Sequence, residues 1–383
     1  MDLIQKELLE AVAGLHEIPA GAFNIRSNGK SVERRTTEHI DIISKEDGSG
    51  IDIIVKPEVR GESVHIPVII SQSGLSEAVY NDFHIGENAD VTIIAGCGIH
   101  NGGTKASQHD GIHRFFIAPG AKVRYIEKHY GSGDGMGKRI MNPQTIVHIA
   151  ENGYMEMETA QIKGVDSTER LTTADLAAGA TLVVTERLLT HGCQSAKSTF
   201  EVALNGEGSG THIISRSVAK EHSKQLFISR VSGNAPCSGH TECDAIIMDE
   251  ASVQAVPEIA ANCTDAALIH EAAIGKIAGE QIVKLMTLGL TEQQAEGHMD
   301  EEFPVVFEIL NRSPHYRGDS PYSAAQPIRK IDSVKLITQP NDGLCGQTCV
   351  AMLAGVTIAE VISVMDCREG QATMGRVISA LNY

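Results

Sequence analysis

Short runs in which apolar and polar residues alternate fill most of the chain between residues 38 and 262. Examples are Ile51–Val55, Val91–Ile94 and Val123–Ile126, each bounded by glycine, asparagine, aspartate or proline. A period of two residues predicts β-strands with one buried face. No run with a helical period interrupts them, so we expect residues 38–262 to form a β core.

Turn sequences rich in glycine and asparagine recur along this region and lead into strands: GENADVTII, APGAKVRYI, AENGYMEME, AAGATLVVT and LNGEGSGTHII. They recur about every 25–33 residues, a spacing typical of one or two coils of a stacked β-solenoid. The alternative is an antiparallel β-sandwich, in which turns recur faster, about every 8–12 residues. The longer spacing favours the solenoid.

The chain before the β region predicts a helix. Residues 1–20 carry apolar side chains at helical spacing, and Pro19 and Gly21 are expected to end this helix. It would cover one end of the β core. The following segment, up to residue 37, holds an Asn28-Gly29 turn.

The chain after the β region predicts three further parts. Residues 263–312 change to a helical period, with a helix expected over Ala278–Leu288. Residues 313–331 are rich in proline, serine and glycine and predict a linker. Residues 332–383 predict a separate, atypical helical tail.

The composition narrows the possible functions. The chain has 383 residues, of which 42% are hydrophobic, and a formal net charge of −17. This charge makes nucleic acid and anionic membranes poor partners, because both bind clusters of lysine and arginine. No apolar run approaches the roughly 20 residues of a membrane helix, and the first residues lack the basic end of a signal peptide. The 8 cysteines lack the density of a disulfide framework, so we expect a cytoplasmic protein, with Cys97 and Cys193 in the core.

Candidate metal ligands form two pairs near the end of the β region. Cys243 and Asp244 are adjacent, and His270 and Glu271 follow about one solenoid coil later. Thiolate, imidazole and carboxylate groups suit iron better than magnesium. Each residue also has a structural alternative. A cysteine beside an apolar run is commonly a small buried hydrophobe, and a histidine–glutamate pair is commonly a cap or a surface pair.

A histidine-rich block forms a second candidate site, with His100, His109, His113 and His129. Histidines at this density suggest a metal site. The alternative is that polar turn residues on stacked coils hydrogen-bond to one another, and Asp110-Gly111 favours such a turn. The nearby sequence GDGMGKR lacks the glycine spacing and the hydroxyl residue of a phosphate-binding loop. We therefore expect no ATP hydrolysis by this chain.

The sequences GAFNIRSNGK, GHTECD and LIHEAAIGKIAGEQ resemble the SufB/SufD family of iron–sulfur cluster assembly scaffolds. The resemblance covers roughly residues 15–312. It implies a mainly β protein whose core, over residues 38–262, is a right-handed parallel β-helix, preceded by an N-terminal segment over residues 1–37. It also implies that a small α-helical domain, residues 263–312, docks an ABC-type ATPase called SufC.

The resemblance further implies roles for the candidate ligands. Cys243 matches the cysteine that scaffolds use for nascent cluster at a dimer interface, Glu271 matches a glutamate of the SufB type, and His270 matches a histidine of the SufD type. With Asp244 beside them, they are expected to bind a transient iron–sulfur cluster. Having both types of ligand in one chain suits a homodimer, and a heterodimer with a paralogue stays open. A desulfurase system would supply the sulfur to this non-enzymatic scaffold.

Two other functions stay open. A structural, SufD-like subunit would dock the ATPase without holding a cluster. A carbohydrate-active β-solenoid enzyme would need paired carboxylates and aromatic platforms for sugar rings, whereas only 4% of the residues are aromatic.

The tail contains QPNDGLCGQTCVAMLAG, which is similar to the nucleophile segment of papain-like cysteine peptidases. Cys345 would open a helix, which lowers a thiol pKa, and Gln339 could donate to an oxyanion. No histidine follows His315 in the sequence, so the catalytic base is missing. We expect a truncated or fused fragment without peptidase activity. Thr357 begins a capping box with Glu360 and predicts a further helix.

Overall fold

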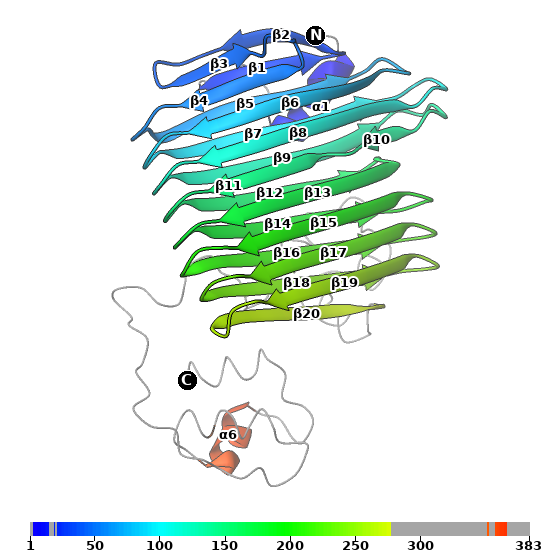
Figure 1. Cartoon of the computed structure of the whole chain (residues 1–383). Helices are drawn as coiled ribbons and strands as arrows, with labels where there is room; N and C mark the ends of the chain where they lie inside the picture. The colour runs from blue at the N-terminus through cyan, green and yellow to red at the C-terminus, as the bar shows by residue number, and fades with distance from the viewer. Residues whose placement is uncertain (1–2, 15–18, 20, 277–350, 352–356, 366–383) are drawn as a thin grey trace. The chain divides into compact units, whose positions relative to one another are not determined.

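The chain folds into a parallel β-solenoid of about 8 turns. The structure is a computed structural model and describes residues 3–14, 19, 21–276, 351 and 357–365. Two long sheets form the walls of the solenoid, and each turn adds one rung to both (Figure 1). The solenoid expected from the spacing of the turns is confirmed, and the antiparallel sandwich is wrong.

The first sheet, sheet A, contains, in spatial order, β2 (Lys30–Arg35), β1 (Ala22–Ser27), β5 (Arg60–Ile70), β7 (Asp90–His100), β9 (Lys122–Ser132), β12 (Tyr154–Lys163), β14 (Thr181–Thr190), β16 (Ser209–Ala219), β18 (Cys237–Ile247) and β20 (Ala266–Lys276). The second sheet, sheet B, contains β3 (Ile40–Ser44), β4 (Gly50–Val55), β6 (Ser76–Ile85), β8 (Ser107–Ile117), β10 (Arg139–Met141), β11 (Gln144–Ile149), β13 (Ser167–Leu176), β15 (Ser195–Leu204), β17 (Lys224–Gly233) and β19 (Ser252–Ala261). Only the β1–β2 and β3–β4 pairs are antiparallel among the described strands.

The recurring turns form one corner of the solenoid. In most of these turns one residue has a positive φ, as at Asn88, Gly120, Asn152 and Gly179. Glycine and asparagine tolerate this left-handed conformation best. Each of these four residues donates its backbone N–H to the turn of the next coil, for example Asn88 to the carbonyl of Pro119 and Gly120 to that of Glu151. This ladder keeps successive coils in register.

Alternation along each strand divides the side chains between the interior and the outer faces. In β9, for example, Val123, Tyr125 and Glu127 are buried whereas Lys122 and Arg124 are exposed. Because the rungs are parallel and in register, each inner position forms a column with the same position of the next coil. The interior is mainly aliphatic, with Phe83 and Phe115 stacked at 4.3 Å between ring centroids.

The N-terminal helix α1 (Leu3–Ala13) is shorter than expected and covers a different surface. It ends at Gly14, which has a positive φ and donates to the carbonyl of Glu10, a common C-terminal cap. Leu8, Leu9 and Val12 are buried on the outer face of sheet A against β5, β7 and β9. The expectation that this helix covers one end of the core is therefore wrong.

The solenoid continues through β20, past the boundary expected at residue 262. The helix expected over Ala278–Leu288 and the linker lie outside the described residues. In the tail, α6 (Ile358–Met365) follows Thr357, as the capping sequence predicts. Cys97 is buried as expected, but Cys193 lies in a turn and is exposed.

Candidate functional site

The two predicted ligand pairs lie on neighbouring rungs, because β18 and β20 are adjacent parallel strands of sheet A. In the register of these strands, Thr241 lies opposite His270, Glu242 opposite Glu271 and Cys243 opposite Ala272. Alternation then divides each pair between the two faces. Cys243 and His270 belong to the inner face, whereas Asp244 and Glu271 belong to the outer face.

The inner pair consists of a buried thiol and an imidazole without hydrogen bonds. Cys243 is 1% exposed. Burial, together with the charges of Glu186 and Asp244, raises the pKa of its thiol to about 12, so the thiol keeps its proton. Burial lowers the pKa of His270, and neither of its ring nitrogens has a hydrogen-bond partner among the described residues. A neutral imidazole with a free lone pair is the form that binds a metal.

A column of polar residues leads along the inner face of sheet A to Cys243. Glu186, Ser215 and Cys243 occupy matching positions on β14, β16 and β18. The Ser215 hydroxyl donates to Glu186 at 2.7 Å. Sequence reasoning missed Glu186 and Ser215 because they lie two coils and one coil before Cys243, respectively. The coil period of the turns is the signal that could have found them.

The outer pair belongs to a larger charged group on β16, β18 and β20. Arg216 lies 3.2 Å from Glu242 and 3.9 Å from Asp244. His240 Nε2 lies 3.8 Å from Glu271. Burial, a hydrogen bond with Glu242 and the charge of that residue raise the pKa of Asp244 to about 6. Glu242 and Asp244 therefore share a proton at mildly acidic pH.

The Asp244 carboxyl predicts a pH dependence of stability. Because its pKa is higher in the folded protein than the usual 3.8, its contribution to stability is present at low pH and is lost as the pH rises through about 6. As the pH rises from 4 to 7, we expect the free energy of unfolding of Asp244→Asn to increase relative to that of the wild type, because asparagine does not ionise. Urea unfolding midpoints of both proteins across this range measure the difference. A difference between the two midpoints that does not change with pH would contradict the proton shared by Glu242 and Asp244.

A buried ion network crosses the solenoid interior before this site. Arg170 of sheet B lies 2.5 Å from Glu127 and 3.8 Å from Glu186, both of sheet A. The phenol of Tyr125 donates to Glu127, and the hydroxyl of Ser198 donates to Glu186. Burial acts to raise the pKa of Glu127, but chiefly the charge of Arg170 outweighs it and holds this pKa well below its usual range.

Together, the fold and the site define a parallel β-solenoid protein whose last described rungs carry thiol, imidazole and carboxylate groups. The sequence of residues 69–303 matches the family described as SUF system FeS cluster assembly, SufBD core domain. This match covers more than half of the chain, and the chain therefore belongs to the SufBD family of iron–sulfur cluster assembly proteins.

Similar proteins carry the same description. The chain is 30% identical over 294 residues to an iron–sulfur cluster assembly SufBD family protein of Archaeoglobus fulgidus, an alignment that covers 74% of this chain and 77% of that protein. It is 28% identical over 302 residues to a protein of this family from Methanocaldococcus jannaschii, covering 76% and 94%. A Methanothermobacter thermautotrophicus relative is 27% identical over 269 residues, covering 69% of this chain and 62% of the relative.

Family membership supports the resemblance seen in the sequence, and no comparison supports the carbohydrate-active alternative. The papain-like interpretation of residues 332–383 has no support from the family match, which ends at residue 303. Cys345 and Gln339 lie outside the described residues. Among the helices that the structure does describe, none is long and apolar enough to cross a membrane.

Proposed function

We propose that this chain is a scaffold subunit of the SUF system, which holds a nascent iron–sulfur cluster as cargo. The observation that carries the proposal is that Cys243 and His270 both belong to the inner face of the last two described rungs of sheet A, two positions apart in the register of β18 and β20. One thiolate and one imidazole bind iron more weakly than four cysteines do, which suits a cluster that must be released.

Cargo binding at this position requires a proton to leave and a rung to move. The Cys243 thiol must lose its proton to bind iron, so cluster loading is coupled to proton release. The 1% exposure of Cys243 means that the cluster reaches it only when the last rung opens. An ABC-type ATPase of the SufC kind, docked through residues 263–312, would drive such opening at a dimer interface, and a desulfurase system would supply sulfur.

The outer pair gives the proposal a second part. Glu271 and Asp244 face away from Cys243, so they do not complete its coordination within one rung. We propose that they bind iron on the outer face or from a partner subunit, either an identical copy or a paralogue. The two faces can therefore be tested separately.

Anaerobic reconstitution of the full chain with ferrous iron and sulfide tests the scaffold function. We expect stoichiometric iron and sulfide in the wild type and a roughly tenfold or larger loss in Cys243→Ala and His270→Ala. Asp244→Asn and Glu271→Gln test the outer pair, because each substitution removes a negative charge and keeps the shape of the side chain. Cys193→Ala, which removes an exposed cysteine, is the matched control.

The same experiment decides between the scaffold and a structural, SufD-like subunit. The burial of Cys243 favours the structural function, since a buried thiol is commonly a small hydrophobe. Equal iron and sulfide contents in the wild type and the Cys243→Ala variant would exclude Cys243 as a ligand. Absence of cluster from both would leave docking of the ATPase as the function of the chain.

A further inference from the structure

A small enclosed cavity lies inside the solenoid between β7, β8 and β9, several coils before Cys243. Its wall includes Cys97, His109, His113, Glu127 and His129. The cysteine and the three histidines are only 3–7% exposed. The sequence predicts either a metal site or hydrogen-bonded turn residues for this histidine block. The structure shows that these three histidines lie on strands and face the interior.

Two imidazoles converge on the empty space above Gly111. A methyl group at Gly111 would lie 3.3 Å from Nε2 of His109 and 3.6 Å from Nε2 of His113. Glycine therefore leaves room for one small group between two ring nitrogens. The cavity volume, about 10 Å³, suffices for a single water molecule or ion.

Cys97 and His129 face this space from the opposite sheet. They occupy matching positions on the neighbouring strands β7 and β9. The thiol of Cys97 is free, and Nδ1 of His129 has no hydrogen-bond partner among the described residues. A buried imidazole nitrogen without a partner is costly, and a ligand at this nitrogen would remove that cost.

Carboxylates lie beside two of the histidines, as they commonly do at metal sites. Nδ1 of His109 lies 3.2 Å from Oε1 of Glu77, an ion-pair distance although the angle is poor for a hydrogen bond. A proton on Nδ1, facing Glu77, would leave the Nε2 lone pair directed at the space above Gly111. Nε2 of His129 lies 3.6 Å from Oε1 of Glu127, which likewise leaves Nδ1 available. Such carboxylate–histidine pairs fix the ring orientation at metal sites.

His113 differs, because both of its nitrogens already have partners. Nε2 lies 3.2 Å from Nδ2 of Asn81, and Nδ1 lies 2.7 Å from the phenol of Tyr125. Burial lowers the pKa of His113 to about 4, so the ring is neutral. It lines the cavity without offering a free lone pair.

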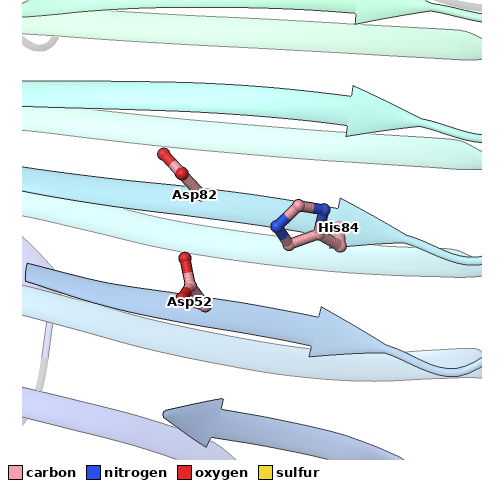
Figure 2. Close-up of side chains that lie close together, drawn as sticks. All are labelled: Asp52, Asp82 and His84. Atoms are coloured by element: carbon pink, nitrogen blue, oxygen red, sulfur yellow. The ribbon is translucent and has the colours of Figure 1, made fainter. Parts of the chain in front are cut away.

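The outer face of sheet B offers a second arrangement of metal-ligand types, Asp52, Asp82 and His84 (Figure 2). Their ligand atoms lie within 4.8 Å of one another. Two cations already neutralise these carboxylates, however. Lys45 lies 2.5 Å from Asp52 and 2.8 Å from Asp82. Arg114 donates to both oxygens of Asp82. A metal ion would have to displace both cations, so this cluster is an ion-pair network.

We propose that the interior cavity binds one transition-metal ion of the Zn²⁺ or Fe²⁺ class through Cys97, Nε2 of His109 and Nδ1 of His129. One thiolate and two imidazoles are a ligand set that these ions favour. The ligand atoms of Cys97, His109 and His129 do not all lie within 4.8 Å of one another. These side chains must therefore move closer together when the ion binds. The Cys97 thiol loses its proton on binding, and the proton leaves to solvent. The ion would join sheets A and B in the middle of the solenoid and stabilise the coils there.

Cobalt is a suitable probe, because a cobalt–thiolate bond absorbs visible and near-ultraviolet light. The full chain carrying Cys243→Ala, which removes the proposed cluster ligand, is expressed in medium with added Co²⁺ and purified under reducing conditions. We expect about one cobalt per chain with thiolate absorption. Cys97→Ala and His109→Ala in the same background should lower the cobalt content about tenfold or more.

Three further variants separate metal binding from general effects on folding. Gly111→Ala keeps every ligand, and Gly111 lies within β8 without a positive φ, so alanine fits the backbone there. The added methyl group fills the cavity and should abolish cobalt binding while circular dichroism stays unchanged. His84→Ala and Cys193→Ala remove exposed groups and should keep the cobalt. Equal cobalt contents in the parent, Cys97→Ala and Gly111→Ala would overturn the proposal, as would a folded parent without cobalt. Neither result depends on whether Cys243 holds a cluster.

Discussion

Replacing Arg170 with methionine is expected to destabilise the solenoid by about 3–5 kcal/mol, the usual cost of removing one partner from a buried ion pair. Arg170 contacts Glu127 and Glu186, and its side chain is 4% exposed. The change leaves two buried carboxylates of the same column of sheet A, separated only by Thr159. Urea unfolding at neutral pH measures the loss.

The pH dependence of this loss identifies its cause. In the wild type, the pKa of Glu127 lies well below its usual 4.5, so its stabilising contribution is present above that value and is lost as the pH falls through the folded pKa. In Arg170→Met no cation compensates for burial, and protonation of the carboxyl groups relieves the cost. The difference from the wild type should therefore shrink as the pH falls from 7 to 5.

Arg230→Met is the matched control for this prediction. Arg230 also contacts two glutamates, Glu201 at 2.6 Å and Glu258 at 2.9 Å, but its side chain is 43% exposed. Solvent screens such pairs, and each contributes about 0.2–1 kcal/mol. Equal losses of stability in Arg170→Met and Arg230→Met would show that burial of the ion network does not increase the cost of removing its arginine.

Two adjacent phenylalanines of β8 are expected to respond very differently to truncation. Phe115 is fully buried and stacks on Phe83, with Tyr125 edge-on at 5.0 Å. Phe115→Ala leaves a cavity and should cost about 3–5 kcal/mol. Phe116 faces outward, is 38% exposed and stacks only on His84 and His148 among the described residues. Phe116→Ala should cost about 1 kcal/mol or less.

Equilibrium unfolding in urea, with far-ultraviolet circular dichroism as the signal, measures both variants. Their comparison tests the register of β8, because a shift by one residue would exchange the two faces. A larger loss of stability for Phe116→Ala than for Phe115→Ala would mean that Phe116, and not Phe115, faces the solenoid interior.

Local patterns predicted much of the fold. The Asn28-Gly29 turn joins β1 to β2, with a positive φ at both residues, and the glycine- and asparagine-rich turns lie at one corner of the solenoid. Local patterns failed where a contact outside the segment decided the outcome. The N-terminal helix ends at Gly14 before Pro19, and its apolar side covers Gly96 and Gly98 of β7. Nothing within residues 1–20 indicates that surface.

The candidate site was predictable as a set of residue types but not as an arrangement. The sequence shows that Cys243 and Asp244 are neighbours, and that His270 and Glu271 are neighbours. It cannot show that each pair is divided between two faces, because β20 appears in the sequence as the start of a helical domain. The same holds for the histidine block, where Asp110-Gly111 predicts a turn but lies within β8.

The sequence by itself determined the strand period, the corner turns and the chemical types of the candidate ligands, because backbone preferences and alternation act over a few residues. Only the tertiary structure decided which side chains meet. Partners such as Glu127 and Arg170, or Glu186 and Ser198, come from opposite sheets, and Glu186 and Ser215 come from different coils. Stacking joins them because parallel rungs repeat the same inward positions, and this register depends on the hydrogen bonds and packing of the whole solenoid.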